Sequence, residues 1–188
     1  MNCFDNANLL VSRKTNIAAV IILLALLTGY GISPVLQAGE TAQAVVKTAF
    51  GADCENMIIR ELDGAKKDVM VAIYSLTRRK INSAFVKAVR RGVKVTVKYD
   101  AGQEEIDAMK ESIGYLKEHG VKCIPVKMTG DYAAMHHKFV VIDRQLVLTG
   151  SYNYTVPATE LNYENVVSID SPEVAAAFTR EFERIKDR

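Results

Sequence analysis

Apolar residues recur along the chain at two different spacings, and the change from one to the other marks the predicted elements. Residues 69–76 are almost continuously apolar, as in a strand buried on both faces, whereas residues 93–100 alternate between apolar and polar side chains. Residues 78–91 and 104–118 repeat apolar side chains at the spacing of an amphipathic helix. Further strands are predicted over residues 42–50, 121–128 and 164–169, and further helices begin near Asp53 and after Ser171.

This order of elements predicts the fold class. Strands that alternate with helices of about a dozen residues form parallel βαβ units. A hairpin within residues 136–153, with its turn at residues 143–145, adds antiparallel strands, and residues 156–162 follow as a polar loop. The expected fold is therefore α/β: a mixed, largely parallel β-sheet flanked by helices on both faces, in a single domain over residues 39–188.

The N-terminal residues 1–38 have the pattern of a targeting segment. Arg13 and Lys14 precede an unbroken apolar run over residues 17–27, and the segment ends in small residues near Ala38. This pattern predicts a signal peptide and a secreted or periplasmic protein. The alternative is an uncleaved membrane anchor, because the apolar stretch approaches the roughly 20 residues that span a bilayer.

The hairpin carries polar side chains that strand packing does not require. Side chains alternate along a strand, so His136 and Lys138 share one face and lie side by side. Ser151 and Asn153, also two residues apart, follow the returning strand and point toward the same pocket. An imidazole, an ammonium, a hydroxyl and an amide that converge on one place suit an anionic tetrahedral substrate such as a phosphodiester.

These residues resemble the signature of the phospholipase D superfamily, H-x-K-x4-D-x6-G-x-x-N. The flanking pattern from about residue 45 onward resembles the small members with a single motif, the bacterial secreted endonucleases. The resemblance implies the same fold and a phosphodiesterase that needs no metal and no other cofactor. The matching positions are His136, Lys138, Asp143, Gly150 and Asn153, with Glu164 as the carboxylate that follows.

The resemblance also implies a mechanism with two histidines, one that forms a phosphohistidine and one that acts as general acid and base. Because the chain contains the motif once, we expect a two-fold homodimer with the site on its axis. Lys138 and Asn153 would bind the non-bridging oxygens, Ser151 would donate a further hydrogen bond, and Glu164 would hold the second nitrogen of His136.

The two remaining signature positions are expected to support the site. Asp143 lies in the predicted turn, where its side chain would bond its own backbone. Gly150 would let the backbone approach the site.

The net charge of the chain does not identify a binding partner. The formal net charge is only +2, so attraction to nucleic acid must come from a local patch. Arg78, Arg79 and Lys80 follow a buried strand, where α/β folds place ligand clefts, and could contact the phosphates on either side of the cleaved one. The alternative is a solvated helix face.

Three functions fit these observations. The first is a non-specific endonuclease acting on DNA or RNA. The second is a phospholipase D or cardiolipin hydrolase acting on phospholipid. The third is a catalytically silent nucleic-acid-binding module, which would have no need for the intact motif. Cys54 and Cys123 form no C-x-x-C pair, and buried free thiols are favoured over a disulfide.

Overall fold

The computed structural model describes residues 43–188, so the predicted leader and the first residue of the predicted strand 42–50 lie outside the described residues. Within this range no helix is long and apolar enough to cross a bilayer. One seven-stranded sheet runs through the domain in the order β1-β7-β6-β5-β2-β3-β4. Its strands are β1 (Val45–Phe50), β2 (Asp68–Ile73), β3 (Lys94–Asp100), β4 (Lys122–Val126), β5 (Lys138–Ile142), β6 (Leu146–Gly150) and β7 (Asn165–Asp170).

The sheet is mixed, which confirms the predicted fold class, but its parallel part is smaller than expected. Among the seven strands of the described residues, only β2–β3 and β3–β4 pair in parallel. β5 returns antiparallel to β2, and β6, β7 and β1 continue antiparallel outward from it. The reason is the connection after β4: residues 127–137 contain no helix and bring the chain back in the opposite direction.

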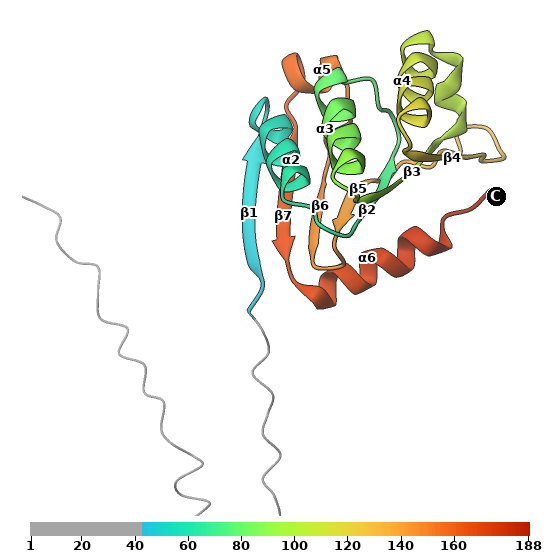
Figure 1. Ribbon diagram of the computed structural model, residues 1–188. Coiled ribbons are helices and arrows are strands. Elements are labelled where there is room, and N and C mark those ends of the chain that lie inside the picture. Colours follow the sequence, from blue (N-terminus) through green and yellow to red (C-terminus); the bar gives the residue numbers. More distant parts are fainter. Residues whose placement is uncertain (1–42) are drawn as a thin grey trace, which may run out of the picture. The chain divides into compact units, whose positions relative to one another are not determined.

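Helices cover both faces of the sheet, as predicted (Figure 1). α2 (Asp53–Asp63), α3 (Arg79–Arg90) and α4 (Asp107–Glu118) lie on one face, and α6 (Pro172–Arg184) lies on the other. The alternation along β2 explains this: Val69, Val71 and Ile73 enter the core beneath α2 and α3, whereas Met70 and Ala72 pack toward α6. The nearly continuous apolar run is thus a strand buried on both faces.

Two predicted boundaries differ from the structure. The helix expected over residues 104–118 is divided into a 3₁₀ turn, η1 (Ala101–Glu105), and α4, because Ile106 between them has an extended backbone. The polar loop expected over residues 156–162 contains a short helix, α5 (Val156–Glu160). Thr155 starts this helix by accepting a hydrogen bond from the Ala158 amide, as an N-cap residue does.

Both cysteines in the described range are free, as favoured from the sequence. Cys54 is fully buried, whereas Cys123 is only partly so. Burial raises the pKa of each thiol to about 11, and the charge of Glu164 adds to the increase at Cys54. Neither thiol is therefore suited to act as a nucleophile near neutral pH.

Candidate active site

The strand directions bring the predicted site residues to one edge of the sheet. β5 is antiparallel to β2, β6 is antiparallel to β5, and β7 is antiparallel to β6. The strands β5 and β7 therefore begin at the edge of the sheet where β2 and β6 end. This edge carries Tyr74 after β2, Lys138 at the start of β5, Gly150 at the end of β6 and Asn165 at the start of β7. Residues separated by about 90 positions in sequence are thereby gathered at one place.

His136 and Lys138 lie beside each other, as predicted. The Lys138 Nζ atom is 3.2 Å from His136 Nε2 and 3.0 Å from the His136 backbone oxygen. The imidazole is exposed, whereas the lysine is half-buried. Desolvation lowers the pKa of Lys138, and the negative charge of Glu164 partly opposes this decrease.

Tyr74 is a neighbour of this pair that the sequence did not reveal. Its ring meets the His136 ring edge-on, with the centroids 4.8 Å apart, and the Lys138 Nζ atom lies 5.4 Å from its centre. The Tyr74 amide also donates to the His137 backbone oxygen at 3.0 Å, which extends the β2–β5 pairing beyond the strands. Tyr74 therefore holds the imidazole and the ammonium in place.

Glu164 and Ser151 form a second group on the same edge. The Ser151 hydroxyl donates to a Glu164 carboxylate oxygen, and it accepts the Asn165 amide at 3.2 Å. The other Glu164 oxygen accepts from Asn162 at 3.3 Å. This differs from the predicted bond between Glu164 and His136, because the carboxylate is directed at Ser151 by the turn that begins β7.

Gly150 permits a close approach, but of a different segment from the one expected. A Cβ atom at this position would lie 2.1 Å from the Asn165 backbone oxygen. The neighbour that requires glycine is thus strand β7, and the approach places Ser151 against Glu164.

Asn153 follows in the loop before α5. Its side-chain oxygen is buried and has no hydrogen-bond partner among the described residues, and no hydrogen bond there joins it to His136 or Lys138. A buried amide oxygen without a partner costs about 1–3 kcal/mol, so this group is available to a ligand or to another subunit.

Asp143 supports the structure of the hairpin, although its hydrogen-bond partners are not those predicted. Its carboxylate accepts the backbone amides of Lys66, Lys67 and Asp68 at 2.9, 2.7 and 3.1 Å. It therefore fastens the hairpin to the loop before β2 and does not bond its own backbone. Asp143 and Arg144 both have a φ of 54°, as in a two-residue hairpin turn.

The three basic residues after β2 have different surroundings. The guanidinium of Arg78 is 14% exposed and binds Glu55 at 2.8 Å and Glu160 at 2.9 Å, so it is committed to an internal ion pair. Arg79 and Lys80 are exposed, with Arg79 paired to Glu111 at 3.1 Å. The predicted contact with substrate phosphates therefore does not suit Arg78.

A cavity of about 330 Å³ opens beside His136. His137 and Glu181 lie on its wall, 3.4 Å apart, and Lys186 and Arg188 add two further cationic side chains. His137 points toward Phe139, on the opposite face from Lys138, as the strand alternation predicts. The lining thus combines the cationic side chains of Lys186 and Arg188 with the carboxylate of Glu181.

Comparisons with known proteins agree with the motif. Residues 58–186 match the family described as cardiolipin synthase, PLD-like domain. A mitochondrial cardiolipin hydrolase from Canis lupus familiaris is 29% identical over 161 residues, which cover 86% of this chain and 60% of that protein. A phospholipase D from Rickettsia conorii is 30% identical over 141 residues, which cover 74% of this chain and 68% of that protein.

Two solved structures share the fold over most of their length. The phospholipase D family member Nuc from Salmonella typhimurium has a TM-score of 0.70 and 26% identity, over 75% of this chain and 93% of its own. NucT from Helicobacter pylori has a TM-score of 0.68 and 28% identity, over 75% and 96%. Agreement in sequence and in fold over this much of the chain shows that it belongs to the phospholipase D superfamily of phosphodiesterases.

Proposed function

We propose that the protein is a metal-independent endonuclease that hydrolyses DNA, and RNA as a second substrate, through a phosphohistidine. The observation that carries the proposal is the His136–Lys138 pair, whose imidazole also borders a cavity with two cationic side chains. An imidazole supplies the nucleophile, and the ammonium stabilises charge on the phosphoryl oxygens. Lys186 and Arg188 on the wall of this cavity would bind phosphates of a polyanionic strand.

The position of Lys138 indicates which imidazole nitrogen attacks. An ammonium group has only donors, so Nε2 beside it carries the lone pair and the proton resides on Nδ1. In the first step Nε2 forms a bond to phosphorus while the bond to the leaving oxygen breaks, and a second imidazole protonates that oxygen. In the second step this imidazole takes a proton from water, the water oxygen bonds to phosphorus, and the phosphorus–nitrogen bond breaks.

The second imidazole would come from another copy of the chain, since one subunit has a single histidine at this edge with a neighbouring lysine. A homodimer is supported by exposed apolar side chains close to Glu164. Phe50, Leu161 and Tyr163 are all largely exposed, and the amide of Gly51, next to Phe50, donates to the Glu164 backbone oxygen at 3.0 Å. An apolar surface beside an incomplete site fits a second copy that would also complete the site.

Nicking of supercoiled plasmid DNA in excess EDTA tests the proposal. We expect the chain from residue 43 onward to nick the plasmid, and His136→Asn to be slower by roughly 10² to 10⁴-fold or more. His119→Asn removes an imidazole at the end of α4 and should retain activity. Nicking that requires added magnesium, or that survives His136→Asn, would contradict the mechanism.

Mixing wild type with His136→Asn tests the shared site. If both histidines act at one site, mixed dimers lose activity, and activity per wild-type chain falls as the variant is added in excess. Constant activity per wild-type chain would show that each subunit acts alone.

Phospholipid is the second candidate substrate. The named relatives are a cardiolipin hydrolase and a phospholipase D, and the exposed Leu161 and Tyr163 could contact a lipid surface. Release of phosphatidic acid from cardiolipin vesicles, without nicking of plasmid by the same preparation, would favour this substrate.

A further inference from the structure

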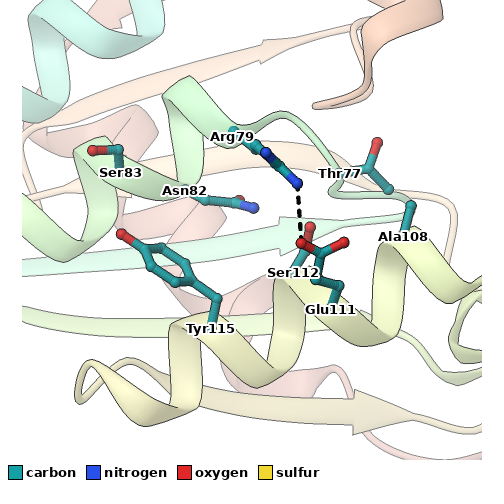
Figure 2. Close-up of a pocket in the computed structure, with 8 residues that line it drawn as sticks. All are labelled: Thr77, Arg79, Asn82, Ser83, Ala108, Glu111, Ser112 and Tyr115. Atoms are coloured by element: carbon teal, nitrogen blue, oxygen red, sulfur yellow. Dashed lines mark hydrogen bonds and ion pairs between the residues drawn. The ribbon is translucent and has the colours of Figure 1, made fainter.

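A second pocket, with a volume of about 540 Å³, lies between α3 and α4 and takes no part in the chemistry described above (Figure 2). Most of its lining residues have polar side chains, and one of them has an aromatic ring. It is lined by Thr77, Arg79, Asn82, Ser83, Ala108, Glu111, Ser112 and Tyr115.

The side chain of Asn82 is unusual because it is buried but incompletely bonded. Asn82 is 2% exposed, and its side-chain oxygen has no partner among the described residues. Figure 2 shows this carboxamide pointing into the space between Tyr115 and Ser112. A carboxamide offers two donor hydrogens and an acceptor oxygen, and rotation by 180° exchanges them. It therefore matches a flat ligand that has both donors and acceptors on one edge.

The charges of the pocket argue against a phosphate as its occupant. Arg79 and Glu111 pair across the opening at 3.1 Å, and both are exposed. Their charges cancel, so the interior is close to neutral and suits an uncharged polar group. The ring of Tyr115 supplies a surface on which a planar group can stack.

The pocket begins close to the catalytic edge. Thr77 on its wall lies three residues after Tyr74, whose ring contacts His136. A chain of this length spans at most about 11 Å. The amides of Thr77 and Arg78 both bond the Tyr154 backbone oxygen at 2.7 Å, next to Asn153. The nucleotides beside the cleaved phosphate would thus pass the opening of the pocket.

We propose that the pocket between α3 and α4 binds a nucleobase of the substrate, next to the cleaved phosphate, by stacking on Tyr115 and hydrogen bonding to Asn82. The inference rests on the proposed function, because it requires a nucleic-acid substrate. It adds a base-dependent contact to a site whose other contacts are with phosphates. The pocket would accept an unpaired base, so a single strand would bind more tightly than a duplex.

A series of fluorescent single-stranded oligonucleotides, each with one abasic position, tests the proposal. Binding is measured by anisotropy to full-length His136→Asn, which cannot turn over the substrate, with Asn82 intact or replaced by Leu. Leucine has the same number and branching of side-chain heavy atoms as asparagine and removes the unpaired amide, and urea denaturation checks that each variant is folded. Asn56→Leu makes the same change at an exposed position of α2, outside the pocket.

With Asn82 intact, one abasic position should weaken binding roughly tenfold, and Asn82→Leu should weaken binding of the unmodified strand and abolish this position dependence. Equal binding of all strands in the series, or a dependence on the abasic position that persists in Asn82→Leu, would overturn the proposal that the pocket binds a base. If binding depends on the abasic position but the wild type cleaves no strand, the proposed base-binding pocket is supported and the proposed endonuclease activity is wrong. If neither binding nor cleavage occurs, both are wrong.

Discussion

The Lys138 Nζ atom lies 3.2 Å from Nε2 of His136, in a position where burial lowers the lysine pKa. The two groups are coupled through this contact. While Lys138 is protonated, it adds positive charge beside Nε2, where phosphoryl oxygens would bind. When Lys138 loses its proton, this charge disappears.

We therefore expect cleavage activity to decline on the alkaline side at a pH below 10.5, the ordinary lysine value, because the folded pKa of Lys138 is lowered. Lys138→Arg should move this decline to higher pH, since a guanidinium stays protonated. It should also reduce the rate at neutral pH, because the planar group does not reproduce the position of the ammonium. The measurement is kcat/KM against pH for both proteins.

Lys98 supplies the control for this pH dependence. Burial also lowers its pKa, but its Nζ atom bonds the backbone oxygens of Phe182 and Ile185 on the α6 side of the sheet. Lys98→Arg should leave the alkaline decline where it is. An unchanged decline in Lys138→Arg would show that another group is responsible.

The ion pair of Arg78 and Glu55 predicts a change in stability and not in substrate binding. Their side chains are 14% and 5% exposed, so removing one partner leaves a buried charge and should cost about 3–5 kcal/mol. Arg78→Met should lower the free energy of unfolding by this amount in urea denaturation. Arg79→Met removes an exposed pair and should cost at most about 1 kcal/mol. Equal effects would contradict the assignment of Arg78 to the protein interior.

The same pair predicts an acid-dependent stability. The hydrogen bond from Arg78 lowers the pKa of Glu55 from 4.5. The lowered pKa means that ionised Glu55 stabilises the folded state. This contribution to stability is complete above the unfolded pKa and is lost as the pH falls through the folded pKa. Stability should therefore decrease below about pH 5, and Glu55→Gln should remove part of this decrease. Urea denaturation at several pH values between 3 and 7 measures the effect.

The elements and the His136–Lys138 pair could be predicted because they depend on local pattern. The buried strand β2, the hairpin and the helical spacing of Ile81, Phe85 and Ala88 all result from the packing of nearby positions. Lys138 follows His136 by two residues, so strand alternation alone places them on one face. The motif then identified the superfamily.

The partners of the other polar residues depend on segments that are distant in sequence, and these were not predictable. Asp143 bonds amides 75 to 77 residues away, and Arg78 bonds Glu160 82 residues away. Tyr74 resembles a core residue at the end of an apolar strand, and only the return of β5 reveals its contact with His136. The direction of that return also explains why the sheet is less parallel than expected.

Gly150 and Gly114 predict opposite effects of the same substitution. At Gly150 a methyl group would meet the Asn165 backbone oxygen at 2.1 Å, so Gly150→Ala must move β7 and should cost about 1–3 kcal/mol or more. It should also slow cleavage, because Ser151 and Glu164 lie at this contact. At Gly114, within α4, an added Cβ atom would meet no atom within 4 Å outside the neighbouring backbone of the helix. Gly114→Ala should therefore stabilise the protein by about 0.5–1 kcal/mol. Thermal unfolding compares the two; a tolerated Gly150→Ala would refute the steric argument.

Asp143 lies in the motif, yet its contacts predict a structural effect. Asp143→Ala would leave three backbone amides, those of Lys66, Lys67 and Asp68, without their acceptor. Two of these bonds are exposed to water, so we expect a loss of about 2–3 kcal/mol rather than three full bond energies. Cleavage per folded molecule, measured well below the unfolding temperature, should stay within about threefold of wild type. If Asp143 instead took part in proton transfer, the rate would fall by roughly 10² to 10⁴-fold while stability changed little. Measuring both quantities on one preparation separates these roles.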